Sequence, residues 1–332
     1  MKEIRLADDF DGWLAATCED LPIVTQWDDG ASPLGPIDDR TPTCSISQPS
    51  IVADMLRETL IEDNNRILEI GTGTGWNTAL LVQRLGEDNV YTVEIDPKLA
   101  QQARDNLATE GRHPNVITGD GAEGYPPGAP YDRVLSTASV FTVPYPWVEQ
   151  TRPGGYVVTP WRTALINGLL LRLMVNDDGT SAGRFVGTAS FMPLRSQRAP
   201  TEDVDISGHG VDSVTSVHPS GPLSVGDAQY AIGMLVPGCY QWLQHEPDGY
   251  VVRMEDAGTQ SWATVTVAAS DSEGRHAVRQ GGPRQLWDEI VSAYDWWRDA
   301  GEPEMTRFGV TVTREGQTVW LDHPVNVVAP SL

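Results

Sequence analysis

The stretch Leu68-Glu69-Ile70-Gly71-Thr72-Gly73-Thr74-Gly75 decides the fold of this chain. The residues from Arg66 to Ile70 predict a buried strand, and those from Asn77 to Leu85 predict a helix. The glycines lie between the two, where the turn is tight and a ligand must lie against bare backbone. The stretch therefore predicts a strand, a glycine-rich ligand loop and a helix, in that order.

Strands and helices continue to alternate beyond this loop. Further strands are predicted at 90–94, 115–118, 133–136 and 155–160, with a helix at 97–111 and a short one near 148–151. Strands separated by helices imply right-handed crossovers and a parallel sheet. We therefore predict an α/β fold with a doubly wound, Rossmann-like sheet.

Acidic residues follow the next two strands of this pattern. Glu94 ends the second strand, where a carboxylate can accept hydrogen bonds from both hydroxyls of a ribose. Asp120, within Gly119-Asp120-Gly121, follows the third strand, where a carboxylate can accept a hydrogen bond from the amino group of an adenine. The carboxyl ends of parallel strands share one edge of the sheet, and open α/β folds bind ligands at that edge. An adenosine-containing ligand is the prediction.

The loop favours S-adenosyl-L-methionine over NAD, because its third glycine comes one residue too early for the pyrophosphate pattern. Glu69 would repel a pyrophosphate and suit a cationic sulfonium and amino group. The alternative is that the glycines only turn the chain and the acids only cap helices. The predicted cofactor-binding residues are Glu69, Gly71, Thr72, Gly73, Glu94, Ile95, Asp120 and Gly121.

Residues 40–160 resemble the protein-L-isoaspartate (D-aspartate) O-methyltransferase family. The stretches that carry the resemblance are Ser45-Ile46-Ser47-Gln48-Pro49-Ser50-Ile51-Val52-Ala53, Gly119 to Pro126, Ala129 to Val134 and Arg152-Pro153-Gly154-Gly155. The resemblance implies methyl transfer to a peptide carboxylate, with Ser47 as a hydroxyl donor to that carboxylate. Thr137 and Ala138, at the end of the fourth strand, should lie near the same carboxylate, and their N–H groups or the threonine hydroxyl could orient it.

Each of these residues has a second interpretation. Ser47 could instead be the N-cap of the helix that follows it, and Thr137 could simply close a turn. Tyr145 and Trp147 lie near the expected substrate mouth and could either contact substrate or pack locally. No general base is expected, because an aspartate side chain is already ionised at neutral pH.

Several departures from the family pattern resemble the subgroup associated with ribosomally made, modified peptides such as lanthipeptides and graspetides. They are Trp76-Asn77, Val143 to Gln150, Phe191-Met192-Pro193-Leu194-Arg195 and the ending 307–322. This resemblance implies methylation of an aspartate in a cross-linked precursor peptide, leading to aspartimide or isoaspartate. The alternatives are a repair enzyme for isoaspartyl proteins and a protein that binds cofactor or peptide without catalysis.

The pattern divides the chain into four parts. We expect an N-terminal arm and substrate-side loop at 1–48 and a methyltransferase domain at 49–195 that ends in a strand hairpin. A polar linker or lid follows at 196–222. The last part, 223–332, is expected to be an α+β module with a helix at 283–298, which could recognise peptide or stabilise the catalytic domain.

Composition restricts the partners. The formal net charge of −23 disfavours nucleic acid and anionic membranes. The three cysteines, Cys18, Cys44 and Cys239, have no metal-binding spacing, and the histidines, His276 included, are expected at the surface. The chain starts without an apolar targeting segment and has no run long enough for a bilayer, so we expect a cytoplasmic protein with no bound metal.

Overall fold

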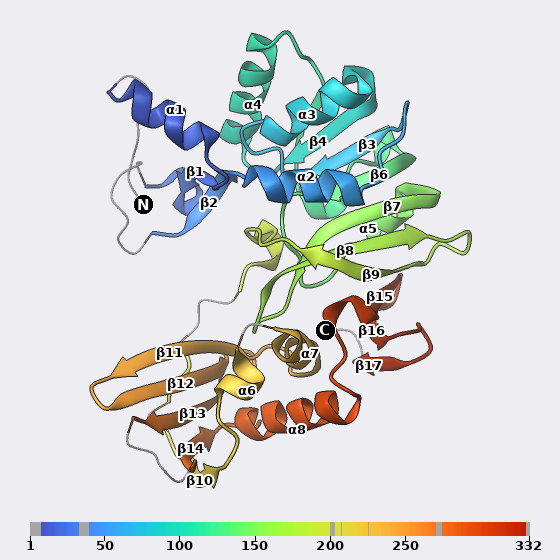
Figure 1. Ribbon diagram of the computed structural model, residues 1–332. Coiled ribbons are helices and arrows are strands. Elements are labelled where there is room, and N and C mark those ends of the chain that lie inside the picture. The colour runs from blue at the N-terminus through green and yellow to red at the C-terminus, as the bar shows by residue number, and fades with distance from the viewer. Residues whose placement is uncertain are drawn as a thin grey trace. The chain divides into compact units, whose positions relative to one another are not determined.

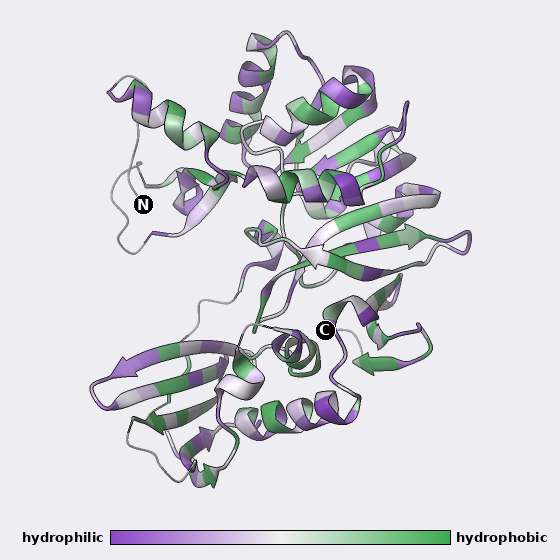
Figure 2. Cartoon of the chain, viewed as in Figure 1, coloured by the Kyte–Doolittle hydropathy of each residue, from purple (hydrophilic) through white to green (hydrophobic). Residues whose placement is uncertain are grey.

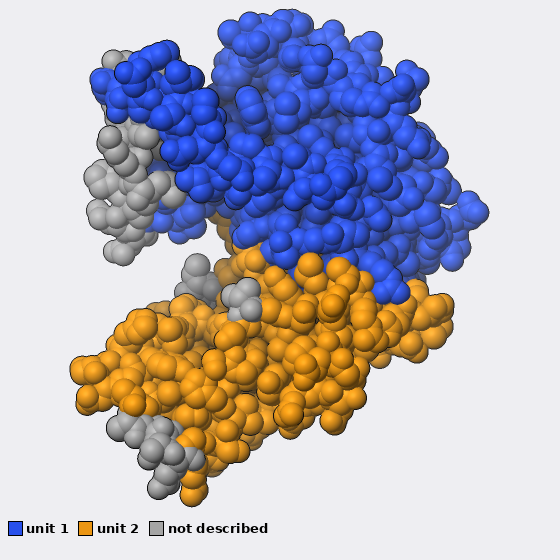
Figure 3. All heavy atoms as spheres, viewed as in Figure 1, with its two compact units in different colours: residues 1–160, 168–197, 311–316 blue, residues 161–167, 198–310, 317–332 orange. Residues whose placement is uncertain are grey.

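The structure is a computed structural model that describes residues 8–32, 40–199, 203–206, 208–224, 226–269 and 274–329 (Figure 1). The chain forms two compact units that are interleaved along the sequence (Figure 3). Unit 1 contains residues 1–160, 168–197 and 311–316, and unit 2 contains residues 161–167, 198–310 and 317–332. Each unit is described below by itself.

The sheet of unit 1 confirms the predicted doubly wound α/β fold. Its strands follow the order β9-β8-β7-β6-β3-β4-β5. The pairs β3–β4, β3–β6, β4–β5 and β6–β7 are parallel, whereas β8 and β9 form an antiparallel hairpin. The strands are β3 (Ile67–Ile70), β4 (Val90–Glu94), β5 (Asn115–Thr118), β6 (Tyr131–Ser136), β7 (Thr151–Arg162), β8 (Asn167–Val175) and β9 (Ser181–Thr188).

The helices of unit 1 other than α1 bury apolar side chains and expose polar ones, so purple and green alternate along them in Figure 2; α1 has no buried residue. They are α1 (Phe10–Cys18), α2 (Pro49–Glu58), α3 (Trp76–Leu85), α4 (Pro97–Thr109) and α5 (Tyr145–Glu149). Asp96 caps α4 by accepting hydrogen bonds from the N–H groups of Lys98 and Leu99. The N-cap of α2 is Gln48, so the expected N-cap at Ser47 is wrong by one residue.

A short antiparallel hairpin precedes α2. It consists of β1 (Ile23–Trp27) and β2 (Pro42–Ile46), with the short 3₁₀ helix η1 (Asp28–Gly30) following β1. The composition of residues 27–42 predicted loop, and the part of that arm from 33 to 39 lies outside the described residues. The sequence did not predict β1, because the strand is short and carries no clear alternation of apolar and polar residues.

Unit 2 holds an antiparallel sheet of order β10-β14-β13-β12-β11. Its strands are β10 (Val211–Thr215), β11 (Tyr240–Glu246), β12 (Gly249–Asp256), β13 (Ser261–Ala268) and β14 (His276–Gly281), and its helices are α6 (Ser220–Leu223), α7 (Asp227–Leu235) and α8 (Leu286–Asp299). Trp287 and Ile290 on α8 pack into a core with Met254 and Val265. The predicted mixture of strands around one strong helix is confirmed.

Two details of this part differ from expectation. Part of the polar stretch expected to be a linker forms β10, which pairs with β14 along its whole length. The expectation that His276 lies at the surface is wrong, because its side chain is buried within β14. The chain closes with β15 (Phe308–Thr313), β16 (Gly316–Leu321) and β17 (Val327–Ala329).

Candidate functional site

The glycine-rich loop connects β3 to α3 through backbone angles that favour glycine. The φ angles of Gly71, Gly73 and Gly75 are 92°, 56° and 90°. A Cβ atom on Gly71 would lie 2.8 Å from the Thr137 hydroxyl, and one on Gly73 would lie 3.2 Å from the Cys44 sulfur. Side chains at these positions would press against Thr137 and Cys44, so the loop requires glycine there, and we call this stretch of bare backbone the cradle.

Glu69 lies beneath this loop. Its side chain is fully buried, and its carboxylate accepts hydrogen bonds from the Asn77 amide at 2.7 Å and the Thr78 hydroxyl at 2.5 Å. Burial raises the pKa of Glu69, and those hydrogen bonds oppose the shift. In this structure Glu69 joins the start of α3 to β3, and its contact with a cationic cofactor group stays a prediction.

Thr72 is also directed away from the ligand edge. Its side chain is buried, and its hydroxyl lies 2.7 Å from the hydroxyl of Thr92 on β4. The side chain therefore supports the loop from below, and a bound ligand would meet the backbone of Thr72 at most.

Glu94 lies at the end of β4, as the sequence predicts. Its two carboxylate oxygens accept hydrogen bonds from the N–H groups of Gly73, at 2.9 Å, and Asp96, at 3.0 Å. A carboxylate has about four acceptor sites, so each oxygen keeps one for a ligand hydroxyl. Burial raises the pKa of Glu94 despite these two hydrogen bonds. Ile95, half-buried, follows at the same edge.

Asp120 and Gly121 follow β5 and complete the third strand end. One oxygen of Asp120 accepts the Ala122 N–H at 2.9 Å, which leaves the other oxygen available. A Cβ atom on Gly121 would lie 2.6 Å from the Ile70 side chain, so this position also requires glycine. The ends of β4 and β5 are tied together, because the Gly119 N–H donates to the Glu94 carbonyl at 2.9 Å.

The structure decides between the two interpretations of Trp147. Its ring is fully buried, and its indole N–H donates to the Gly121 carbonyl at 2.7 Å. Trp147 therefore packs locally and supports the cofactor-side loop. The Tyr145 hydroxyl donates to the Gly179 carbonyl at 3.1 Å, so its polar end is also engaged within unit 1.

Thr137 and Ala138 lie beside the glycine loop, but their donors are already engaged. The Thr137 hydroxyl donates to the Gly71 carbonyl at 2.6 Å, and its N–H donates to the Ile70 carbonyl at 2.8 Å. The Ala138 N–H donates to the Ser136 hydroxyl at 3.2 Å. Thr137 thus joins the ends of β3 and β6, whereas Ala138 closes a turn on Ser136. The contact of Thr137 and Ala138 with a substrate carboxylate stays a prediction.

Ser47 has a different environment. It lies between β2 and α2, is partly exposed, and its hydroxyl has no hydrogen-bond partner within the described ranges of the chain. Of the three predicted substrate-side residues, it is the one whose hydroxyl remains available to a ligand.

Several residues around the site were not predicted as site residues, although Arg195 lies in a stretch that carries the subgroup resemblance. Arg195 reaches Asp29 at 2.9 Å and Asp96 at 3.9 Å, and the Gln26 amide donates to Asp96 at 2.9 Å. These contacts join the β1–β2 hairpin to the end of β4. Although burial alone would raise the pKa of Asp96, hydrogen bonds led by that from Gln26, together with the charge of Arg195, lower it. Because the partners are far apart in sequence, spacing could not reveal them.

The described residues contain no group of three or more histidine, cysteine and acidic side chains that could hold a metal ion. Within the same ranges, no helix has the length and apolar character needed to cross a membrane.

The cradle and the two carboxylates fit an adenosine-containing cofactor: bare backbone lies at Gly71 and Gly73, and free acceptor sites lie at Glu94 and Asp120. Together with the strand order β7-β6-β3-β4-β5, they define a class I S-adenosylmethionine-dependent methyltransferase.

Comparison with known proteins identifies the family. Residues 25–199 match the family described as protein-L-isoaspartate(D-aspartate) O-methyltransferase (PCMT). The protein-L-isoaspartate O-methyltransferase of Thermococcus onnurineus is 41% identical over 152 residues, which cover 45% of this chain and 69% of that protein. The corresponding protein of Pyrococcus horikoshii is 38% identical over 151 residues and is covered to 68%. The chain therefore belongs to this family of S-adenosylmethionine-dependent protein carboxyl O-methyltransferases.

A solved structure extends the likeness of the fold. A protein-L-isoaspartate O-methyltransferase superposes with a TM-score of 0.53 at 20% identity, covering 93% of this chain and 89% of that chain. The likeness thus reaches beyond residues 25–199. Residues beyond 199 therefore have a counterpart in the fold of at least one protein of this description.

Proposed function

We propose that this chain methylates the free α-carboxylate of an isoaspartyl residue in a peptide or protein. The observation that carries the proposal is the pair of carboxylates, Glu94 and Asp120, beside the bare backbone of Gly71 and Gly73. This pair lies within the part of the chain that matches the family.

The roles of the residues follow from their surroundings. Glu94 would accept hydrogen bonds from the ribose hydroxyls, and Asp120 would accept one from the adenine amino group. The glycine backbone would contact the rest of the cofactor. When bound, S-adenosylmethionine supplies an electrophilic methyl group. Ser47 would donate its hydroxyl to one oxygen of the substrate carboxylate and so orient the other. Because the carboxylate is already ionised, the protein needs to supply position and exclude water rather than a base.

The test compares two synthetic peptides that differ only in one residue, isoaspartate in one and aspartate in the other. Purified chain, S-adenosylmethionine and each peptide are incubated, and the product is followed by mass spectrometry. We expect one added methyl on the isoaspartyl peptide and none on the aspartyl peptide. No methylation of either peptide, with the chain folded and binding S-adenosylhomocysteine, would contradict the proposal.

A second candidate substrate is an aspartate in a ribosomally made, cross-linked precursor peptide. Two stretches that resemble the peptide-modifying subgroup contact the site: Trp147 donates to Gly121, and Arg195 pairs with Asp29 and Asp96. In that reaction a backbone nitrogen would attack the methyl ester, methanol would leave, and an aspartimide would form. Methylation of the aspartyl peptide, followed by net loss of one water from the starting mass, would favour this substrate.

A further inference from the structure

A segment of unit 1 that follows β9 contacts the sheet edge at which the site lies. It consists of residues 191–197, whose last two residues belong to the stretch expected to be a linker or lid. The Ser139 N–H donates to the Met192 carbonyl at 2.8 Å, and the Leu194 N–H donates to the Ser139 carbonyl at 2.8 Å. Leu194 also lies against Gly121, where an added Cβ atom would be 3.4 Å from it. The segment therefore joins the loop after β6 to the turn after β5.

Gln197 ends this segment and holds the loop after β6 with its side chain. Its amide oxygen accepts hydrogen bonds from the N–H groups of Phe141, at 2.7 Å, and Thr142, at 3.0 Å. Its amide nitrogen donates to the Thr142 carbonyl at 2.7 Å. A single orientation of the amide makes all three contacts, because the oxygen accepts and the nitrogen donates. One half-buried side chain thus fixes the backbone of two consecutive residues.

The loop held in this way, residues 137–142, lies on one side of the cradle. The Thr137 hydroxyl, at its start, donates to the Gly71 carbonyl at 2.6 Å. The two carboxylates proposed to bind the cofactor, Glu94 and Asp120, follow β4 and β5, which lie on the other side of β3 in the strand order. Because the cofactor would extend from the cradle toward these carboxylates, the end of β6 remains for the peptide.

We propose that Gln197 is a positioning residue for the peptide substrate, because it keeps the loop 137–142 in the conformation that binds the peptide. This role rests on the proposed methylation of a peptide. Without the three hydrogen bonds, only a fraction of the molecules would have the loop in place, and the apparent affinity for the peptide would fall in proportion to that fraction. The complex with bound peptide would react at its usual rate, since its loop is ordered.

Gln150 provides a matched comparison on the cofactor side. Its amide oxygen accepts a hydrogen bond from the Tyr125 N–H at 2.7 Å, and its amide nitrogen donates to the Glu123 carbonyl at 2.7 Å. It therefore holds the turn after β5 in the same way that Gln197 holds the loop after β6. Loss of the Gln150 amide should affect the cofactor, whereas loss of the Gln197 amide should affect the peptide.

The variants are Gln197→Met and Gln150→Met in the full chain, because methionine is also unbranched and lacks the amide. At saturating S-adenosylmethionine, we expect Gln197→Met to raise the KM for the methylated peptide about tenfold and to keep kcat within about twofold. Its affinity for S-adenosylhomocysteine should be unchanged. Gln150→Met should instead weaken S-adenosylhomocysteine binding about tenfold.

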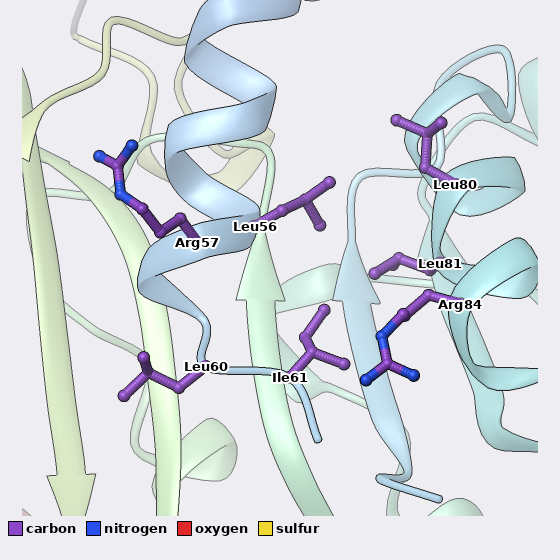
Figure 4. A pocket seen from close by; sticks show the side chains of 7 residues that line it. All are labelled: Leu56, Arg57, Leu60, Ile61, Leu80, Leu81 and Arg84. Atoms are coloured by element: carbon purple, nitrogen blue, oxygen red, sulfur yellow. The ribbon is translucent and has the colours of Figure 1, made fainter. Parts of the chain in front are cut away.

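The surface control is Arg84→Ala, at the groove between α2 and α3 that Figure 4 shows. This variant removes an exposed ion pair with Asp63, which contributes little to stability. It should change neither the KM for the peptide nor the affinity for S-adenosylhomocysteine.

Two further measurements do not need turnover. Amide hydrogen exchange at Phe141 and Thr142 should be faster in Gln197→Met than in the unchanged chain, and exchange at Tyr125 should be faster in Gln150→Met. Fluorescence anisotropy of labelled isoaspartyl and aspartyl peptides gives the peptide affinity of each variant directly.

These measurements separate the role of Gln197 from the proposed function. Weaker peptide binding and faster exchange in Gln197→Met, without methylation of any peptide, would support the role of Gln197 and contradict the proposed function. Methylation with an unchanged KM in Gln197→Met would overturn this role and leave the function standing. Equal losses of peptide and S-adenosylhomocysteine affinity would also overturn it, because Gln197 would then support the whole sheet edge. The same holds for faster exchange without any change in peptide binding.

Discussion

Ser47 is the residue on which the substrate side of the site depends. Its hydroxyl is partly exposed and forms no hydrogen bond within the part of the chain that the structure describes. The Ser47 hydroxyl therefore contributes little to the stability of the folded chain and is available to a substrate. Loss of its hydroxyl should therefore affect turnover and leave stability unchanged.

We expect Ser47→Ala to lower kcat/KM for the peptide about 10- to 100-fold, because one hydrogen-bond donor to the reacting carboxylate is lost. The melting temperature and the affinity for S-adenosylhomocysteine should be unchanged. Ser45→Ala, in the same short segment, is the matched control. Equal loss of activity in both variants would show that the segment, and not the Ser47 hydroxyl, matters.

Glu94 should make cofactor binding depend on pH. Burial raises the pKa of Glu94, so on acidification this carboxylate gains its proton at a higher pH than an ordinary glutamate does. A protonated carboxyl group accepts weaker hydrogen bonds from the ribose hydroxyls than a carboxylate does. We expect the affinity for S-adenosylhomocysteine to fall as the pH decreases through the raised pKa, measured by calorimetry between about pH 5 and 8.

Glu94→Gln should bind the same ligand about 10- to 100-fold more weakly at neutral pH and with a flat pH profile. The glutamine amide has one oxygen, so one of the N–H groups of Gly73 and Asp96 loses its acceptor, which lowers stability, while loss of the charge acts in the opposite direction. A carboxyl whose pKa is raised on folding favours the folded state below its unfolded pKa and loses that contribution as the pH rises. Removing its charge therefore relieves a burial cost at neutral pH. If the affinity of the Glu94→Gln variant for S-adenosylhomocysteine still depended on pH, a group other than Glu94 would be responsible for the titration.

At the scale of elements, contacts of Arg195 and Gln26 connect the β1–β2 hairpin to the site. Arg195 joins Asp29, beside β1, to Asp96, the N-cap of α4, and Gln26 of β1 also donates to Asp96. Cys44 of β2 lies against Gly73. The hairpin therefore forms one wall of the cofactor cradle, and its attachment should influence cofactor binding.

We expect Arg195→Ala to weaken S-adenosylhomocysteine binding about 3- to 10-fold and to speed amide hydrogen exchange in Ile23–Trp27. The reason is that the bridge between Asp29 and Asp96 is lost, while Gln26 keeps one contact. Arg314→Ala, which removes an exposed ion pair with Glu149, serves as the control. Unchanged exchange in β1 would mean that Arg195 does not hold the hairpin.

The sequence predicted the elements whose pattern is strong. β3 and β4 are largely buried and mostly apolar, β6 contains the apolar pair Val134-Leu135, and the glycine turn places the helix after β3. The sheet and its order could be predicted from these features. β1 and β10 were not predicted, because both are short and their apolar residues do not alternate clearly. The orientations of Glu69, Thr137 and Ala138 were not predictable either, since spacing gives the strand end at which a residue lies but not its hydrogen-bond partners.

At the scale of the whole molecule, the two units are not consecutive pieces of chain. Unit 1 takes Thr311–Gly316 from the end of the sequence, where Arg314 pairs with Glu149 at 2.7 Å and lies over the Tyr145 ring. Residues 25–199, which match the family, therefore do not include all of unit 1.

We expect a chain shortened to residues 1–199 to unfold at a lower temperature than the full chain, by about 5 °C or more, because unit 1 loses one of its segments. Arg314→Ala in the full chain should shift the melting temperature much less, since it removes one exposed ion pair. Calorimetry of the three proteins provides the measurement. A shortened chain as stable as the full one would show that unit 1 does not need its last segment.

The place of Cys44 has a practical consequence. Cys18 is exposed, Cys239 is buried in unit 2, and burial raises the thiol pKa of both Cys44 and Cys239. A maleimide added to the native protein should thus modify Cys18 first and reach Cys44 only when the hairpin lifts from the glycine loop. The rate at which Cys44 is labelled then reports how often the hairpin opens. A bound nucleoside should slow this labelling.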